Sequence, residues 1–388
     1  MIKHPTPPRG KKFQVADFVP VKLQFLANSL ASRLNTNSTL NGHKLLAITP
    51  WPFPHDFLGH LHTRFPGLSV ALYKAPFGEG NWNDIPEEDK KDVTILVTGT
   101  CFPTLEQAPK LQFVQVLSAG ADFVLDAPAF KNSNIPFCTA NGVHGPQISE
   151  WVIGTFLAHK KKLPQYLELQ HNAQWRRLSE PDDTVGQRVG ILGYGSIGRQ
   201  VARICKAIGM DVHAYTLHPR KTPESRRDET YTPPGLGDPE GIFPSKWFSG
   251  SSKQELHDFL DSGLDLLVLS APLTKSTVGL ISHQEFNILG KKKAFVSNIS
   301  RGQMINTDAF VEALEGEVIR GAAIDVTDPE PLPDGHKLWT TKNLIITPHV
   351  SGATTAYAKR FLAILEDNLE RFSQGRKLTN EVSRKDGY

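Results

Sequence analysis

The sequence predicts an α/β protein built of two doubly wound parallel-sheet domains. Its 388 residues exceed what one hydrophobic core usually supports, so two domains are the default expectation. Short apolar runs alternate with helical or irregular segments, as in a parallel sheet covered by helices. Between residues 189 and 216, a strand, a glycine-rich turn, a helix and a second strand follow one another. Together these observations indicate a chain of βαβ units.

The first predicted sheet begins at Lys44. Its strands are four apolar runs bounded by turn residues, KLLAIT, LSVALY, VTILVTG and FVQVLSAG. A helix-forming stretch from Gln147 to Leu167 leads to the second set, VGIL, DVHAYT, LDLLVLSAP, AFVSNIS, GAAIDV and LIITP. Residues 354–373 have apolar side chains at helical spacing and no strand after them. We expect them to form a last helix that packs back on the first domain.

Residues 193–198 read GYGSIG directly after the apolar strand VGIL. In a dinucleotide-binding turn, Gly193 makes the tight turn, Gly195 lets the backbone approach a pyrophosphate, and Gly198 lets the helix pack on the strand. The helix that follows begins with unpaired N–H groups that bind phosphate well. The pattern alone is weak, and a glycine-rich turn with a purely structural role is the alternative. The strand before it, the amphipathic helix after it and the next strand at 211–216 favour dinucleotide binding.

The connection from Thr216 to Leu264 is unusually long for a crossover. Its prolines and glycines, concentrated in TPPGLGDPEGIFPSKWFSG, predict that it lacks regular structure. One interpretation is a surface insertion. The other is a flap over the adenosine end of a dinucleotide, or a dimer contact, because the segment begins at the sheet edge that binds that end.

Composition excludes several classes of protein. The formal net charge of +3 is too small to favour nucleic acid or an anionic membrane as a partner. No apolar run approaches the roughly 20 residues that a membrane helix needs. The cysteines Cys101, Cys138 and Cys205 are scattered and lack metal-type spacing, so we expect buried thiols in a reducing compartment and no metal site.

The N-terminal 40 residues carry six Lys or Arg side chains against one Asp. They include VKLQFLANSLASRL, whose apolar spacing predicts an amphipathic helix. This profile fits either a helical arm packed on the first domain, which we favour because no cleavage site is evident, or a mitochondrial targeting peptide. The corresponding locations are the cytoplasm, our first expectation, and the mitochondrion.

Three polar side chains follow three late strands of the second set. Arg301 follows AFVSN, Glu330 lies in DVTDPEP after GAAI, and His349 lies in TPHVSG after LIIT. The carboxyl ends of parallel strands meet at one edge, where ligands bind in open α/β sheets. Each residue singly has a structural explanation, as a surface ion pair, a solvated carboxylate or a half-buried histidine. Their coincidence at strand ends favours a catalytic group.

These side-chain types suit the reduction of a 2-oxo acid. When hydride reaches the C2 carbonyl, the developing alkoxide must receive a proton, and histidine titrates in the right range. A neighbouring carboxylate favours the protonated imidazole and fixes its orientation. A planar guanidinium clamps the substrate carboxylate through a forked contact that lysine cannot reproduce.

The chain resembles the D-isomer-specific 2-hydroxyacid dehydrogenase family from about Lys44 to Phe372. The resemblance is carried by SAGAD at 118–122, GYGSIG, APLT at 271–274, NISRG, DVTDPEP and TPHVSG, in the family's order. It implies two Rossmann-like domains, the nucleotide-binding domain (150–348) being inserted into a substrate-binding domain (1–149 and 349–388). It also implies a homodimer formed by the arm around residues 145–180.

The resemblance also implies roles for individual residues. Arg301 would bind and polarise the substrate, His349 would be the acid/base, and Glu330 would orient it. The backbone N–H groups of Ala119 and Gly120 would hold the substrate carboxylate. The expected cofactor-binding residues, among which Asp325 would contact the nicotinamide carboxamide, are Gly193, Tyr194, Gly195, Ser196, Ile197, Gly198, Thr216, His218, Arg220, Ala271, Pro272, Ile299, Asp325 and His349.

The residues after the second strand of the nucleotide-binding unit bear on the choice of cofactor. Where NAD-binding chains carry a carboxylate for the ribose hydroxyls, this chain has Thr216, followed by His218, Arg220 and Lys221. A hydroxyl and cations would attract a 2′-phosphate. The YTLHPR stretch is similar to that of NADP-dependent glyoxylate/hydroxypyruvate reductases. We expect NADP(H), with NAD(H) as the alternative if these cations are solvated.

The sequence therefore predicts an NADPH-dependent 2-oxo acid reductase that binds neither nucleic acid nor membrane. The alternatives are an NAD-dependent D-2-hydroxyacid or phosphoglycerate dehydrogenase and a corepressor-like, nucleotide-gated interaction module. A formate dehydrogenase is disfavoured because that group pairs its histidine with glutamine. The substrate, glyoxylate, hydroxypyruvate or a bulkier 2-oxo acid, stays open: Trp51, Phe53, Thr100 and Cys101 fit either the pocket wall or the core.

Overall fold

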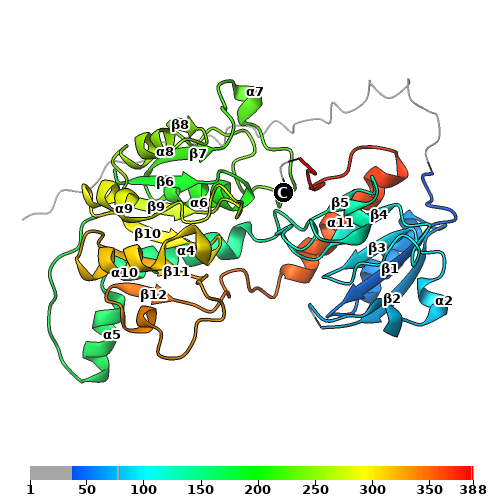
Figure 1. Cartoon of the computed structure of the whole chain (residues 1–388), viewed down its shortest axis with the longest axis horizontal. Helices are drawn as coiled ribbons and strands as arrows, with labels where there is room; N and C mark the ends of the chain where they lie inside the picture. Colours follow the sequence, from blue (N-terminus) through cyan, green and yellow to red (C-terminus); the bar gives the residue numbers. More distant parts are fainter. Residues whose placement is uncertain (1–36, 77, 386, 388) are drawn as a thin grey trace, which may run out of the picture. The chain divides into compact units, whose positions relative to one another are not determined.

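The computed structural model describes residues 37–76, 78–385 and 387, which form two wholly parallel sheets. The five-stranded sheet has the order β2-β1-β3-β4-β5, and the seven-stranded sheet the order β12-β11-β10-β9-β6-β7-β8. Helices lie on both faces of the larger sheet (Figure 1). The predicted α/β class with two doubly wound sheets is confirmed. The domain limits at residues 149 and 348 stay a prediction.

The five-stranded sheet is built around β1, which pairs in parallel with β2 and with β3. Every residue of β3 and β4 is buried, as expected for strands covered on both faces. Its fifth strand was missed because two residues are too few to give a periodic pattern. The elements are β1 (Lys44–Thr49), α1 (His55–Arg64), β2 (Ser69–Lys74), η1 (Trp82–Asp84), α2 (Glu87–Lys90), β3 (Ile95–Thr98), β4 (Phe113–Val116), α3 (Pro128–Lys131) and β5 (Phe137–Cys138).

The strand order of the seven-stranded sheet reverses at β6, which pairs with β7 on one side and with β9 on the other. Such a switch point marks the ligand-binding edge in open α/β sheets. The elements are α4 (Gly145–Lys160), α5 (Leu163–His171), β6 (Arg188–Leu192), α6 (Ser196–Ala207), β7 (Asp211–Thr216), α7 (Pro223–Arg226), β8 (Lys246–Ser249), α8 (Lys253–Leu260), β9 (Leu266–Leu269), α9 (His283–Gly290), β10 (Phe295–Asn298), η2 (Gly302–Met304), α10 (Thr307–Glu315), β11 (Gly321–Ile324), η3 (Lys337–Thr340) and β12 (Leu344–Ile346).

The last helix, α11 (Tyr357–Ser373), lies against the five-stranded sheet, as Figure 1 shows. Its apolar stripe, represented by Phe361 and Leu365, is fully buried in one cluster with Leu45 and Ala47 of β1. The expectation that it packs back on the first sheet is therefore confirmed. It begins at Tyr357, three residues later than the pattern alone predicted.

One prediction about local structure was wrong. The proline- and glycine-rich connection from 217 to 263 contains β8, which pairs with β7 as an edge strand. Its prolines precede the strand, and a proline removes only its own N–H from a ladder, so KWFS remains free to pair. The stretch from Gln147 to Leu167 is helical, as predicted, and it is divided into α4 and α5 at Lys162, which takes a left-handed backbone (φ 57°).

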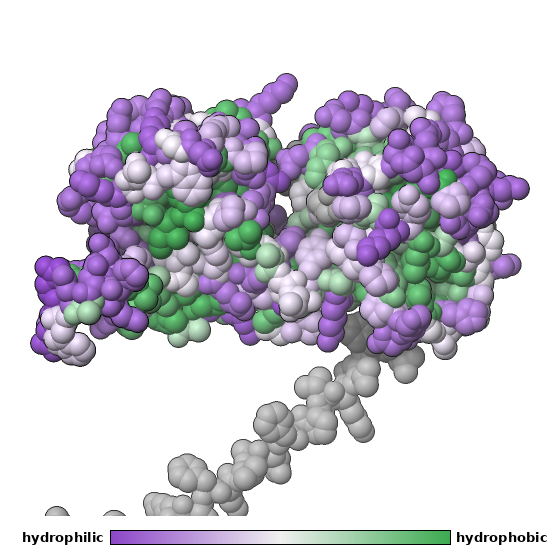
Figure 2. Space-filling view, turned by 90° about the horizontal axis from the view of Figure 1, so that it is seen from below, coloured by the Kyte–Doolittle hydropathy of each residue, from purple (hydrophilic) through white to green (hydrophobic). Residues whose placement is uncertain are grey.

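Other features of the chain bear on its class. Among the described residues, none of the helices is long and apolar enough to cross a membrane. The three cysteines are buried and unpaired, as expected. Figure 2 shows a mainly hydrophilic surface with apolar patches on the face drawn. The predicted N-terminal amphipathic helix lies outside the described residues.

Candidate active site

His349 and Glu330 meet at the carboxyl edge of the seven-stranded sheet. His349 lies three residues beyond β12, and its Nδ1 is 2.6 Å from Oε1 of Glu330 in the loop after β11. Both side chains are partly exposed, so a substrate can reach them. His349 has a left-handed backbone (φ 55°), a strained conformation for a residue other than glycine. Since Nδ1 faces the carboxylate, Nε2 is the ring nitrogen that is left for another partner.

Asp325 holds the segment that carries His349. Its side chain is 1% exposed, and its carboxylate accepts hydrogen bonds from the amides of Val350 at 2.9 Å and Ser351 at 2.8 Å and from the hydroxyl of Thr347. The amide of His349 donates to the Asp325 carbonyl at 2.8 Å. Both carboxylate oxygens are thus engaged within the protein. The structure gives Asp325 a positioning role that the sequence did not indicate, beside the predicted contact with the carboxamide.

Arg301 lies three residues beyond the end of β10, and its side chain reaches the loop between β4 and α3. Its Nη2 donates to Oδ2 of Asp122 at 2.6 Å, and its Nη1 donates to the carbonyl of Ser300 at 2.8 Å. A Cβ at Gly120 would lie 2.8 Å from Nη2, so the backbone of Gly120 and the guanidinium are in close contact. The predicted substrate residues Arg301 and Gly120 are therefore neighbours. Ala119 is the residue before Gly120 in the same loop and is partly buried.

The pairing of Arg301 with Asp122 was not predicted. Both side chains are partly exposed, so the ion pair contributes little to stability. A substrate carboxylate would compete with Asp122 for the same guanidinium. The available signal was Asp122 itself, an acidic residue in the SAGAD loop that the substrate was expected to contact.

The glycine turn has the geometry that a pyrophosphate requires. A Cβ at Gly195 would meet nothing within 4 Å, whereas one at Gly198 would lie 2.5 Å from the carbonyl oxygen of Gly193. Gly195 therefore faces open space, and Gly198 allows α6 to pack against the turn. Gly193 has φ 100°, and its carbonyl accepts a hydrogen bond from Ser270 at 2.7 Å. These residues fit a dinucleotide, held by the amino end of α6.

Two side chains of the turn form hydrogen bonds with other parts of the protein. The hydroxyl of Tyr194 donates to Asp238 at 2.8 Å, and that of Ser196 donates to Asn141 at 2.6 Å. Both residues are buried, so they can offer a cofactor backbone atoms only. The other predicted neighbours of the cofactor differ in burial: Ile299 is buried, Ile197 and Ala271 are partly buried, and Pro272 is exposed.

The long connection after β7 is fastened to the glycine turn by Asp238. This carboxylate is 1% exposed and, besides Tyr194, accepts the amides of Ile242 and Phe243. Arg199 of α6, itself 3% exposed, lies 3.1 Å from Asp228 of the connection and donates to the Arg226 carbonyl. The connection is therefore packed against the glycine turn and α6.

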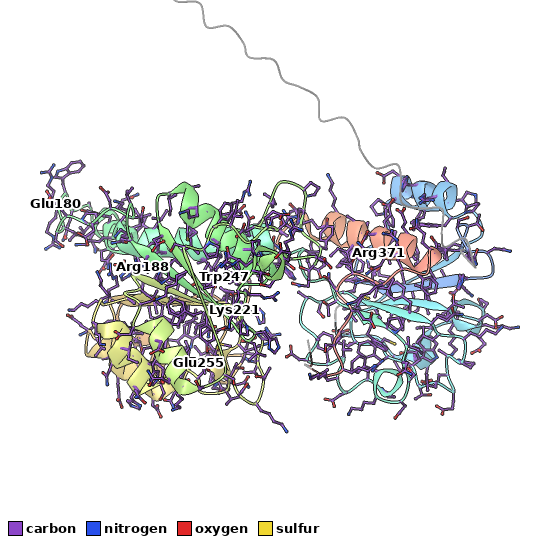
Figure 3. The ribbon with its side chains drawn as sticks, turned by 90° about the horizontal axis from the view of Figure 1, so that it is seen from above. Glu180, Arg188, Lys221, Trp247, Glu255 and Arg371 are labelled. Atoms are coloured by element: carbon purple, nitrogen blue, oxygen red, sulfur yellow. The ribbon has the colours of Figure 1, made fainter. Side chains whose placement is uncertain are left out.

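The adenosine end of the site is shaped by hydrogen bonds within the loop after β7. Thr216 donates to the carbonyl of His218 at 2.8 Å, and Arg220 donates through Nη1 to the carbonyl of Ser225 at 2.6 Å. The Arg220 guanidinium is thus oriented by α7, and within the part of the chain that the structure describes its other N–H groups have no hydrogen-bond partner. His218 and Lys221 are exposed, and Lys221 is labelled in Figure 3.

Trp51, Phe53, Thr100 and Cys101, which the sequence allowed as either pocket wall or core, differ in burial. Phe53 and Cys101 are core residues, each about 5% exposed or less. Burial raises the pKa of the Cys101 thiol to about 11, so it stays protonated. Trp51 packs edge-on against Tyr357 of α11, with ring centroids 5.5 Å apart. Thr100 is partly buried.

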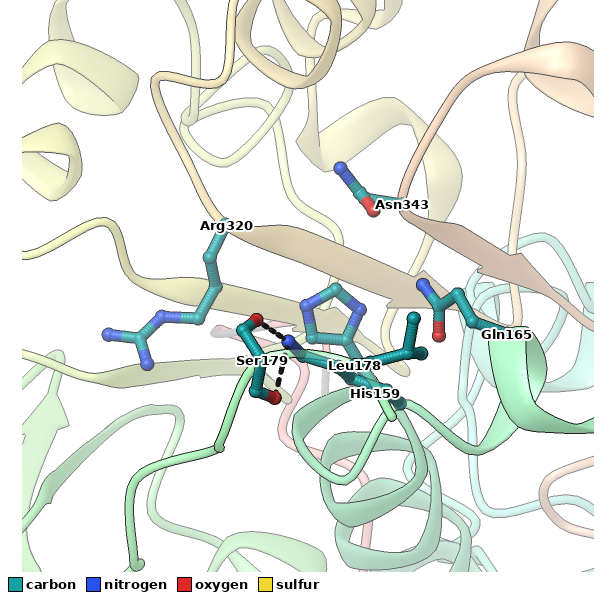
Figure 4. A pocket seen from close by; sticks show the side chains of 7 residues that line it. His159, Gln165, Leu178, Ser179, Arg320 and Asn343 are labelled. Atoms are coloured by element: carbon teal, nitrogen blue, oxygen red, sulfur yellow. Dashed lines mark hydrogen bonds between the residues drawn. The ribbon is translucent and has the colours of Figure 1, made fainter. Parts of the chain in front are cut away.

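A separate pocket, drawn in Figure 4, lies at the opposite edge of the seven-stranded sheet, where Arg320 precedes β11 and Asn343 precedes β12. Lys162, which also lines it, donates to the carbonyl of Ser179 at 2.8 Å. No predicted site residue lines this pocket. Among the described residues, no group of acidic, histidine or cysteine side chains is placed to hold a metal ion.

Comparisons with known proteins agree with this geometry. A family model described as D-isomer specific 2-hydroxyacid dehydrogenase, NAD binding domain, matches residues 153–234 and 245–351. A glyoxylate reductase from Aeropyrum pernix is 30% identical over 288 residues, 72% of this chain and 78% of the relative. A putative 2-hydroxyacid dehydrogenase from Haemophilus influenzae is 30% identical over 301 residues, 74% of this chain and 86% of the relative.

The fold is shared with solved structures. A D-isomer specific 2-hydroxyacid dehydrogenase from Xanthobacter autotrophicus Py2, solved in complex with NADPH and MES, matches with a TM-score of 0.70 at 24% identity. The match covers 89% of this chain and 99% of that chain. Fold and relatives together define an NAD(P)-dependent oxidoreductase. The chain belongs to the D-isomer-specific 2-hydroxyacid dehydrogenase family, as the sequence motifs predicted.

Proposed function

We propose that this enzyme reduces a 2-oxo acid to the D-2-hydroxy acid, with NADPH as the hydride donor and His349 as the proton donor. The observation that carries the proposal is the 2.6 Å contact between His349 Nδ1 and Glu330, at the same sheet edge as Arg301. A carboxylate at this distance accepts a hydrogen bond from Nδ1–H and so holds the imidazole ring in one orientation. Nε2 then presents the proton to the substrate oxygen.

The roles of the other residues follow from their chemistry. Arg301 would exchange Asp122 for the substrate carboxylate and polarise the C2 carbonyl through its fork. The N–H groups of Ala119 and Gly120 would complete the carboxylate site. The glycine turn and the start of α6 would hold the pyrophosphate, and the bound nicotinamide supplies the hydride. Asp325 keeps the segment bearing His349 in place during the reaction.

The preference for NADPH is supported by the loop after β7. Thr216 stands where a carboxylate would repel a 2′-phosphate, and Arg220 lies four residues further on, oriented by Ser225. The charge-assisted contact would favour NADPH over NADH, which has no 2′-phosphate. The relation to a glyoxylate reductase supports glyoxylate or hydroxypyruvate as substrate, with bulkier 2-oxo acids as alternatives.

A turnover assay tests this function directly. NADPH and NADH oxidation is followed with glyoxylate, hydroxypyruvate, pyruvate and an aromatic 2-oxo acid, and the configuration of the chiral products is determined by chromatography. We expect turnover with at least one 2-oxo acid, D-products, and a higher kcat/KM for NADPH. L-products, or no turnover with any substrate, would refute the proposed reaction, whereas preference for NADH would refute only the cofactor assignment.

We also propose that the enzyme is a homodimer in the cytoplasm. Apolar side chains are exposed on the arm around residues 145–180, with Leu163 at 50%, Leu167 at 62% and Trp175 fully exposed. A partner subunit would cover them. Light scattering coupled to gel filtration would detect a monomer if this is wrong. A C-terminal fluorescent fusion would separate cytoplasmic from mitochondrial location.

A further inference from the structure

A buried glutamine joins the two places where the chain passes between the sheets. The chain leaves the five-stranded sheet after β5 and returns to it after β12. Gln147, in the first turn of α4, belongs to the first passage, and Gly352 belongs to the second. The side-chain amide of Gln147 donates to the carbonyl of Gly352 at 3.1 Å. Gln147 is 8% exposed, so water competes little for this hydrogen bond.

The orientation of the Gln147 amide is fixed by its neighbours. Arg360 of α11 donates from Nη1 to Oε1 of Gln147 at 2.6 Å and to the carbonyl of Val143 at 3.2 Å. A guanidinium has donors only, so the amide oxygen must face Arg360. The amide nitrogen therefore faces Gly352 and Nδ1 of His144, which is 3.1 Å away.

His144 accepts that hydrogen bond because it is neutral. Burial is the main reason why the pKa of His144 is lowered to about 4. The Gly352 backbone opposes this shift, and the charges of Arg360 and His349 add smaller lowering effects. At neutral pH its Nδ1 is thus available as an acceptor. A Cβ at Gly352 would lie 3.2 Å from this same nitrogen, so the two passages are in close contact.

The segment after His349 is consequently held from two sides. Asp325 binds the amides of Val350 and Ser351, and Gln147 binds the carbonyl of Gly352. Gly352 is three residues beyond His349, whose left-handed backbone needs support from its surroundings. Loss of either anchor would let this backbone relax and move the imidazole away from the reacting oxygen.

We propose that Gln147 is a positioning residue for His349, held in its own orientation by Arg360. The inference rests on the proposed function, in which His349 is the proton donor. Gln147 touches neither Glu330 nor Arg301 in the hydrogen bonds of the structure; it acts through the Gly352 carbonyl. Its removal should therefore slow the step that needs a correctly placed His349 and leave cofactor binding intact.

Two substitutions separate the donor to Gly352 from the contact with Arg360. Gln147→Met removes both hydrogen bonds at similar volume. Gln147→Glu keeps an oxygen for Arg360 but places a second oxygen opposite the Gly352 carbonyl. Both should lower kcat roughly ten- to a hundredfold, the effect expected of a small misplacement, with the Kd for NADPH unchanged within about twofold. If Gln147→Met fails to fold, the Glu variant, which retains its Arg360 partner, carries the test.

Gln115→Met is the matched control. Gln115 is buried too, at 0% exposure, and donates to backbone carbonyls, those of Cys138 and Thr139, but it lies within the five-stranded sheet. This variant should lose stability without losing kcat per folded molecule. A kcat loss in the control as large as in the Gln147 variants would overturn the proposal, because general destabilisation would then explain both.

A double-mutant cycle with His349→Ala provides the decisive readout. If Gln147 acts through His349, adding Gln147→Glu to His349→Ala should cause no further loss of the single-turnover rate. An additive loss would overturn the positioning role, and so would wild-type kcat in both Gln147 variants. These results leave the proposed function standing if His349→Ala alone is impaired. Wild-type turnover in His349→Ala would overturn the proposed function itself.

Discussion

Replacing Asp325 by Asn tests how the catalytic segment is held. The carboxylate accepts two amides and one hydroxyl, and both oxygens are in use. An amide has one oxygen, which can keep the Val350 and Thr347 donors, while its NH₂ group must then face the amide of Ser351. One charge-assisted hydrogen bond is lost and one buried N–H is left unpaired, so the free energy of unfolding should fall by about 2–3 kcal/mol.

The Asp325→Asn substitution should also lower kcat by more than its loss of stability explains. His349 shares this segment, and its displacement by a fraction of an ångström would lower kcat by roughly ten- to a hundredfold. The assay combines urea unfolding followed by tryptophan fluorescence with steady-state kinetics under conditions where every variant is folded. The KM for NADPH should rise as well if the Asp325 side chain also binds the carboxamide.

Asp238→Asn is the matched control for this experiment. Asp238 is equally buried and likewise accepts one hydroxyl and two amides, but its donors, Tyr194, Ile242 and Phe243, lie at the glycine turn and in the long connection. The Asp238→Asn variant should lose a comparable amount of stability, and its kinetic effect should be a higher KM for NADPH. If Asp325→Asn destabilises the protein while kcat at saturating cofactor stays at the wild-type value, Asp325 does not position His349.

Four further outcomes are expected. His349→Ala should lower kcat roughly 10²–10⁴-fold with little change in cofactor Kd, measured by stopped-flow turnover and fluorescence titration; near wild-type turnover would exclude it as the acid/base. Arg301→Lys should raise KM for the 2-oxo acid and lower kcat while sparing NADPH binding, because the fork is lost; unchanged kinetics would place the clamp elsewhere. Arg220→Ala should weaken NADPH binding by about 1.5–3 kcal/mol, roughly ten- to a hundredfold, and leave NADH unaffected; equal effects on both cofactors would contradict a 2′-phosphate contact. Because burial lowers the pKa of His144 to about 4, this residue contributes stability above its unfolded pKa of about 6.5 that is lost as pH falls towards 4, and a His144→Asn variant should lack this loss in pH-dependent unfolding.

The regular pattern of the chain was sufficient to predict most of the fold. Strands such as β3, β9 and β11 were found, since burial on both faces leaves a nearly continuous apolar run. The glycine turn was found because each of its glycines answers a separate steric requirement. β5 and β8 were missed: the first is two residues long, and the second follows a run of prolines and pairs only with β7.

The residue types of the site were equally accessible from the sequence, because strand ends in a parallel sheet meet at one edge. The sequence placed Arg301, Glu330 and His349 at that edge, and the 2.6 Å contact between the last two agrees with it. Their chemical roles stay predictions for kinetics to test. Asp122 in the SAGAD loop was the one sequence signal for the pair between Arg301 and Asp122. The pairing itself was not predicted, because the two residues follow strands of different sheets and lie 179 positions apart.

Local sequence determined which residues form strands, where the glycine turn lies and which side chains stand at strand ends, since these depend on spacing and near neighbours. Tertiary structure alone decided what supports them. Asp325 reaches forward to the segment of His349, Asp238 fastens a long connection to the glycine turn, and Gln147 links Arg360 to Gly352. Each of these contacts satisfies a buried polar group with a partner distant in sequence, and such a partner is brought near only when the sheets have assembled.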